Sequence, residues 1–141
     1  MIGCNAVSNP TTTKFPTEFS HDPILSDPTN YRRITGSLQY LTLTRPDIAF
    51  SINQLSQHMH NLLPQHVYLL KRLLRYIKGT IDYDIPINKS DLALNSFSDA
   101  NWAGDPNSRK STLGYCSFLG STLISWTIKK QHTFARSSTK S

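Results

Sequence analysis

Residues 31 to 41 read YRRITGSLQYL, and their apolar side chains recur at steps of three and four residues. This spacing places them on one face of an α-helix. The apolar members are Tyr31, Ile34, Leu38 and Leu41. Asp27 can cap the first free N–H groups of the helix, and Pro28 suits its first position. The pattern therefore predicts a helix that begins at Asp27 and stops before Pro46.

The helical period continues in two later segments. Thr44 and Asp47 have the spacing of a capping box, which predicts a second helix directly after the first. Its expected apolar stripe consists of Ile48, Ile52, Leu55 and Met59. A third helix is predicted over about residues 64–78, ended by Gly79. Its expected inward face consists of Val67, Leu70, Leu74 and Ile77. We expect the three helices to pack as one small unit over residues 27–79.

After Gly79 the sequence takes on the character of β-strands. Residues 80–87 are rich in β-formers, and aromatic and branched residues continue beyond them. Strands are expected at residues 92–99, 112–119 and 123–128, with a turn at Gly120-Ser121. Three consecutive strands favour an antiparallel meander. The sequence thus predicts an α+β fold, in which a three-helix unit precedes a three-stranded sheet.

The first 26 residues are rich in Thr, Ser, Pro and Asn and show no sustained period. They predict an extended lead that packs poorly. The two cysteines, Cys4 and Cys116, lie far apart, which favours free thiols over a zinc site or a disulfide, with Cys116 buried in a strand.

Composition excludes several classes of protein. No apolar run approaches the roughly 20 residues that cross a bilayer, so no membrane association is expected. The first residues show no basic segment followed by an apolar core, which predicts an intracellular protein without a secretory signal. Fifteen Lys and Arg against nine Asp and Glu give a net charge of +6, which suits contact with phosphate backbones. Glu18 is the single glutamate in the chain.

Several motifs in a fixed order carry a resemblance to a known family. They are residues 31–41, 44–48, 73–80, 97–106, 109–112, 114–116, 124–126, 129–131 and 136–139. Together they closely resemble the copia-type retrotransposon Pol polyprotein downstream of its polymerase palm. The resemblance implies a polyprotein fragment: a helical connection region of reverse transcriptase type at residues 27–79, then a truncated ribonuclease H-like domain at residues 80–141. The sheet would then be the opening of an incomplete ribonuclease H-like fold.

The resemblance also implies which catalytic groups to look for. The palm, with its paired aspartates, would lie before residue 1. Ribonuclease H chemistry uses two Mg²⁺ ions held by several carboxylates. The family's first ligand maps to Asp99, but Lys140 stands at the position of its glutamate, and the remaining ligands would lie beyond Ser141. Asp105 precedes Pro106 and suits a turn better than a metal site. We therefore expect Asp99 to be vestigial, with a weak metal site if any, and no cofactor.

Basic residues gather in two parts of the sequence. Those of the third helix are Lys71, Arg72, Arg75 and Lys78, and those of the strand region are Arg109, Lys110, Lys129 and Lys130, with Arg136 beyond them. Each group can be either a solvated charged face or a contact surface for a nucleic-acid backbone. Trp102 and Trp126 can stack on bases or support the loop and the core. His58 and His60 are expected at the surface rather than as metal ligands.

Three functions remain open from the sequence. The first is a remnant of the Pol polyprotein without catalytic activity of its own. The second is a weak, non-specific nucleic-acid-binding module, which the net positive charge favours. The third is an RNA–DNA hybrid nuclease completed in trans, which Lys140 at the position of the family glutamate disfavours. A sheet that lacks the rest of its domain would expose one apolar face, which predicts marginal stability.

Overall fold

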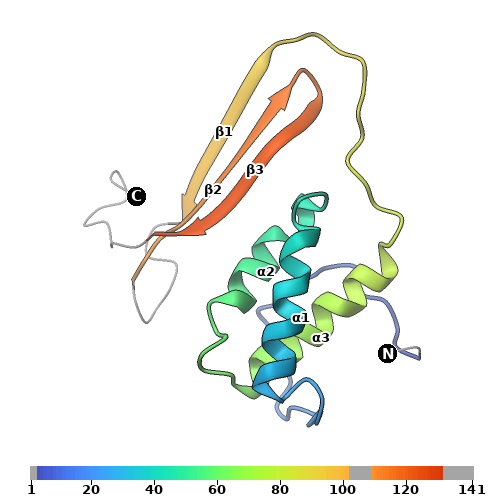
Figure 1. Ribbon diagram of the computed structural model, residues 1–141, viewed down its shortest axis with the longest axis vertical. Coiled ribbons are helices and arrows are strands. Elements are labelled where there is room, and N and C mark those ends of the chain that lie inside the picture. The colour runs from blue at the N-terminus through green and yellow to red at the C-terminus, as the bar shows by residue number, and fades with distance from the viewer. Residues whose placement is uncertain (1–2, 102–108, 132–141) are drawn as a thin grey trace. The chain divides into compact units, whose positions relative to one another are not determined.

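The computed structural model describes residues 3–101 and 109–131. By their contacts the residues divide into two compact units, residues 1–84 and residues 85–141. The elements are α1 (Pro28–Leu41), a 3₁₀ turn η1 (Pro46–Ile48), α2 (Ala49–Ser56), α3 (Pro64–Gly79), β1 (Leu94–Asn101), β2 (Thr112–Leu119) and β3 (Thr122–Lys130) (Figure 1). Three helices followed by a three-stranded antiparallel sheet confirm the predicted α+β class. None of the described helices has the length and apolar content of a membrane span.

Helix α1 begins as its sequence predicts. The Asp27 carboxylate accepts hydrogen bonds from the N–H groups of Thr29 and Asn30, with Pro28 at the first helical position. Tyr31 and Leu38 are buried as predicted, and the Tyr31 hydroxyl donates to the carbonyl of Leu55 in α2. The expectation for Leu41 was wrong. It is the last residue of α1 and is 38% exposed, while Thr35 is fully buried one helical turn earlier than Leu38.

The second helix departs from its prediction at its start. The 3₁₀ turn η1 intervenes before α2, and neither element has a side-chain cap. The expected capping box was wrong because both of its residues have other partners. The Thr44 hydroxyl donates to the Leu41 carbonyl, and Asp47 is bound by Arg45. The apolar stripe is nevertheless confirmed: Ile48, Ile52 and Leu55 are buried, and Met59 packs against them.

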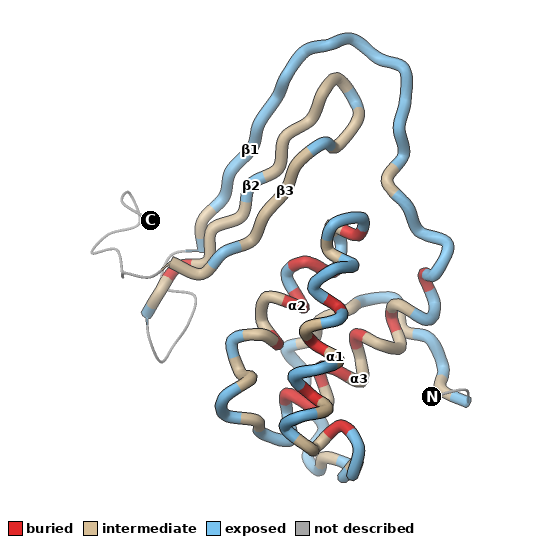
Figure 2. Tube along the Cα trace, viewed as in Figure 1, coloured by how far each residue is buried: buried red, intermediate tan, exposed pale blue. Residues whose placement is uncertain are grey.

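Helix α3 presents a slightly different face to the core than expected. Val67 and Leu70 are buried as predicted, but Leu74 and Ile77 are only partly buried. The other residues of α3 in the hydrophobic core are Leu69, Leu73 and Tyr76. Figure 2 shows that the buried positions concentrate in the helical unit.

Residues 3–26 are mostly exposed, but a few of their side chains pack on the helical unit. Leu25 belongs to the buried core, and Val7 packs against it. Phe15 and Phe19 form a ring cluster with Tyr68 of α3, with centroids 6.1 and 5.9 Å from the tyrosine ring. Residues 3–26 contain no helix or strand, so side chains rather than backbone ladders fix this segment.

The sheet is a meander with strand order β1-β2-β3, as predicted. Strand β2 has the predicted bounds, β1 lies two residues later than expected, and residues 80–87 form no strand. One face carries the cross-strand row Phe97, Cys116 and Trp126, whereas the other carries Ser96, Ser117 and Ser125. Cys116 and Trp126 are partly buried, so the expectation of a buried Cys116 was wrong. Of the described residues after position 84, Ser111 alone is buried.

Candidate nucleic-acid interface

Four of the predicted basic residues meet at one end of the β2–β3 hairpin. Arg109 and Lys110 lie just before β2, and Lys129 and Lys130 close β3. The strand register pairs Thr112 with Lys130 and Leu113 with Lys129. Beyond the last pair, the Gln131 N–H donates to the Ser111 carbonyl at 2.9 Å. Because neighbouring residues of a strand point to opposite faces, Lys129 and Lys130 place one cation on each face of this sheet end.

Asp99 lies on β1, two residues before Asn101, with which that strand ends at the same end of the sheet. Its cross-strand neighbour is Gly114, which in turn pairs with Ile128, so this row of the sheet holds one carboxylate. Within residues 3–101 and 109–131, no three His, Cys, Asp or Glu side chains are placed to hold a metal ion. One carboxylate supplies too few oxygen ligands for two Mg²⁺ ions, so the described residues do not fit the metal pair that the resemblance implies. Lys140, Asp105, Trp102 and Arg136 lie outside the described residues.

The basic side of α3 is occupied by the chain's own lead. Arg72 Nε donates to the carbonyls of Asn9 and Thr11 at 3.0 and 3.1 Å. Arg75 Nε donates to the Asn5 carbonyl at 2.7 Å, and Lys78 Nζ to the Cys4 carbonyl at 3.1 Å. Lys71, Arg72 and Arg75 are partly buried and Lys78 is exposed, so this side of α3 is bound by the lead and still partly open to solvent.

Lys71, the fourth of these cations, forms an ion pair. Its Nζ lies 3.1 Å from Asp22 Oδ2. The N–H groups of Leu25 and Ile24 also donate to Asp22. The Leu25 N–H and the Lys71 ammonium hold the pKa of the Asp22 carboxyl below its usual value. This carboxylate closes the turn that leads into α1.

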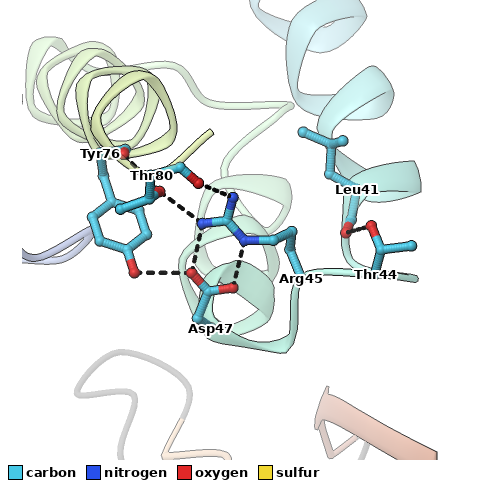
Figure 3. Close-up of polar contacts among 6 residues, drawn as sticks. All are labelled: Leu41, Thr44, Arg45, Asp47, Tyr76 and Thr80. Atoms are coloured by element: carbon cyan, nitrogen blue, oxygen red, sulfur yellow. Dashed lines mark hydrogen bonds and ion pairs between the residues drawn. The ribbon is translucent and has the colours of Figure 1, made fainter. Parts of the chain in front are cut away.

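A second polar centre joins the start of η1 to the end of α3 (Figure 3). Arg45, of which 7% is exposed, binds Asp47 through Nε and Nη2 of its guanidinium at 2.9 and 2.8 Å. Its Nη1 donates to the Thr80 carbonyl and its Nη2 to the Thr80 hydroxyl, each at 2.7 Å. The Tyr76 hydroxyl donates to Asp47 Oδ2 at 2.9 Å. Each of the three guanidinium nitrogens has at least one acceptor, as a buried charge requires.

The charges of this centre reinforce one another. Hydrogen bonding to Arg45 lowers the pKa of Asp47, and hydrogen bonding to Asp47 raises the pKa of Arg45. Burial raises the pKa of Tyr76, with a smaller contribution from the Asp47 carboxylate. The guanidinium carbon also lies 5.5 Å from the ring centroid of Tyr83 and 6.0 Å from that of Tyr76. The arrangement holds a structural ion pair rather than a reactive group.

His66 is a buried residue that sequence reasoning did not single out. Its Nδ1 accepts a hydrogen bond from the Leu63 N–H at 3.1 Å, which caps α3. Its ring stacks on His58 with centroids 3.9 Å apart. Burial, together with the neighbouring charge of His58, lowers the pKa of His66 to about 4. The spacing of three between the residue before Pro64 and His66 could have indicated this cap.

Comparison with known proteins places these features in a family. No family model and no solved structure matches the chain. It is 45% identical to an uncharacterised mitochondrial protein of Arabidopsis thaliana, over 99% of this chain and 58% of that protein. It is 51% identical to the retrovirus-related Pol polyprotein from transposon RE1 of the same plant, over 82% of this chain and 8% of the polyprotein. The corresponding polyprotein from transposon RE2 is 45% identical over 99% of this chain and 10% of its own length. The chain belongs to the copia-type retrotransposon Pol family.

The Arg45 centre links two of the motifs that carry this Pol-family resemblance. Arg45 and Asp47 come from the motif at residues 44–48, and Tyr76 and Thr80 come from the motif at residues 73–80. Two segments that are separate in a copia-type Pol sequence therefore meet in one hydrogen-bonded group. This chain spans 58% of the mitochondrial protein named first and no more than a tenth of the two polyproteins.

Proposed function

We propose that this Pol-family chain binds the backbone of nucleic acids without sequence preference and performs no polymerase or nuclease chemistry of its own. The observation that carries the proposal is the gathering of Arg109, Lys110, Lys129 and Lys130 at one end of the β2–β3 hairpin. Side chains of this kind attract phosphates and release the counterions condensed on them. The net charge of +6 supports the same partner.

The proposed lack of chemistry rests on the surroundings of Asp99. Gly114 lies beside it in the sheet and Ile128 lies one strand further along the same row, and neither supplies a metal ligand. Lys140 at the position of the family glutamate adds a cation where a second carboxylate is needed. In this proposal the helices correspond to a connection region and the sheet to the opening of a ribonuclease H-like fold, as the family resemblance implies.

Binding is tested by fluorescence anisotropy with a short labelled RNA–DNA hybrid over a range of salt. Lys129→Gln/Lys130→Gln is expected to weaken binding and to reduce the slope of log affinity against log salt by up to about 2. The matched control is Arg32→Gln/Arg33→Gln, which removes the same charge from α1 and is expected to change binding less. Equal losses in both double variants would mean that net charge, and not the sheet end, is responsible.

The lack of nuclease activity is tested with the same hybrid and added Mg²⁺ or Mn²⁺. We expect no cleavage above that of buffer. Cleavage by the purified chain that disappears in Asp99→Asn would show that Asp99 is catalytic and would refute this half of the proposal. Cleavage that persists in Asp99→Asn would point to a contaminating nuclease.

A further inference from the structure

Residues 4–22, which we term the N-terminal segment, contact all four cations on the polar side of α3. We propose that part of this segment, residues 4–11, is an intramolecular competitor for polyanions. It covers Arg72, Arg75 and Lys78 in the free chain, and a nucleic-acid backbone displaces it. The inference rests on the proposed function. It makes the polar side of α3 a second binding surface besides the sheet end, one that the N-terminal segment keeps covered in the free chain.

The chemistry of the contacts favours exchange. Arg72 and Arg75 donate from Nε to backbone carbonyls, which accept hydrogen bonds without neutralising the charge. Within the described residues, no carboxylate pairs with either guanidinium. A phosphate offers both a negative charge and two oxygens that match the guanidinium fork. A polyanion can therefore neutralise the charge of these two arginines, which the carbonyls of the segment cannot do.

The segment is held unevenly along its length. Phe15 and Phe19 pack on Tyr68, Asp22 pairs with Lys71, and Leu25 is buried, so the later part is anchored. Residues 4–11 depend on single hydrogen bonds near the surface and on the packing of Val7. A hydrogen bond of this kind contributes only about 1 kcal/mol net. We therefore expect residues 4–11 to lift from α3 while residues 15–25 stay in place.

Gly79 offers a way to displace the early part of the segment without altering any charge. A Cβ at Gly79 would lie 2.6 Å from the Cβ of Ala6, closer than two carbon atoms can pack. Gly79→Ala should therefore push residues near Ala6 away from the end of α3. Gly36 provides a matched control, because it is also helical and a Cβ there meets nothing within 4 Å.

The experiment compares the affinity of the wild-type chain, Gly79→Ala and Gly36→Ala for the labelled hybrid at one salt concentration. Gly79→Ala is expected to bind about threefold or more tightly than the other two. In this variant, chains whose residues 4–11 have left α3, and which can therefore bind the hybrid there, are no longer a minor fraction. Adding Arg72→Gln/Arg75→Gln to Gly79→Ala should abolish the gain. A gain that survives this addition would overturn the inference.

Cys4 supplies a second readout that needs no destabilising variant. Its carbonyl is bound by Lys78 and its thiol is free and partly buried. Adding the hybrid to the wild-type chain should speed the alkylation of Cys4 by an uncharged maleimide. The alkylation of Cys116 should not become faster. Peptide mass mapping measures both rates. If Gly79→Ala fails to fold, an unchanged rate at Cys4 while hybrid is bound refutes the inference.

The two proposals fail in different ways. If the wild-type chain binds the hybrid and Gly79→Ala binds it equally well, the segment is no competitor, but the proposed function stands. If neither chain binds at low salt, both proposals are wrong. Binding by Gly79→Ala with none by the wild-type chain would support the inference most directly.

Discussion

Arg45 Nη1 lies 2.7 Å from the carbonyl oxygen of Thr80, a residue 35 positions later in the chain. This contact connects the start of η1 to the residue that follows α3. Thr80 in turn donates from its hydroxyl to the Tyr76 carbonyl at 2.8 Å, so the final turn of α3 is tied to the same guanidinium. The helical unit therefore has a polar link at this point in addition to its apolar core.

Replacing Arg45 by lysine should destabilise the helical unit by about 2–4 kcal/mol, because an ammonium cannot bind Asp47 and Thr80 together. The measurement is urea unfolding followed by circular dichroism of the helices. Arg33→Lys is the matched control, since Arg33 is exposed and its guanidinium donates to the Asn30 side chain, and it should change stability by less than about 0.5 kcal/mol. Equal stability of the two variants would contradict a structural role for Arg45.

Thr35→Val should stabilise the helical unit by about 1 kcal/mol. Thr35 is fully buried and, among the described residues, its Oγ1 has no hydrogen-bond partner of ordinary geometry, although the Tyr31 side chain lies near it, so the hydroxyl is desolvated with little compensation. Valine keeps the shape of the side chain and removes the polar atom. Thermal unfolding is the measurement, and Thr35→Ala, which also leaves a cavity, should instead lower the midpoint. A lower midpoint for Thr35→Val would reveal a polar partner for Thr35.

Stability of the helical unit should fall as pH is lowered from about 6.5 towards 4. In this range the folded unit keeps His66 neutral, whereas an unfolded histidine binds a proton near pH 6.5. The stabilisation is thus fully present above about pH 6.5, and the loss below it can reach about 3 kcal/mol at 1.36 kcal/mol per pKa unit.

Two glutamine variants test this dependence by urea unfolding at several pH values. His66→Gln should flatten the profile, because glutamine can accept from the Leu63 N–H but does not titrate in this range. His60→Gln removes a histidine of the neighbouring loop and should leave the slope in place. A slope that is unchanged in His66→Gln would assign the pH dependence to another group.

Gly120→Ala should destabilise the sheet unit by about 2 kcal/mol or more. Gly120 has φ 58° at the first position of a two-residue hairpin turn, where an L side chain is strained. An added Cβ would also meet Ser90 Oγ and the carbonyl oxygen of Asp91. Hydrogen exchange of β2 and β3 is the measurement, and it should become faster. Gly114→Ala is the control, since its nearest neighbour would lie 3.8 Å away; equal exchange in both variants would refute the argument.

The sequence by itself determined the parts of this protein that depend on neighbouring residues. Asp27 and Pro28 fix the start of α1 because capping needs groups only two or three positions apart. The bounds of β2 and the turn at Gly120 follow from local strand and turn preferences. The ordered motifs likewise predicted the copia-type Pol family, which the relatives confirm.

The tertiary structure decided the features that depend on partners far away in the chain. Asp47 leaves the expected cap because its carboxylate is bound by Arg45 and by Tyr76, a residue 29 positions later that no local pattern indicates. The cations of α3 have the spacing of a solvated face, yet Arg72, Arg75 and Lys78 bind carbonyls of residues 61 to 74 positions earlier. Periodicity shows which side of a helix is polar. What covers that side depends on where the rest of the chain packs, because every residue type offers a backbone carbonyl as an acceptor, so the sequence does not show which segment binds there.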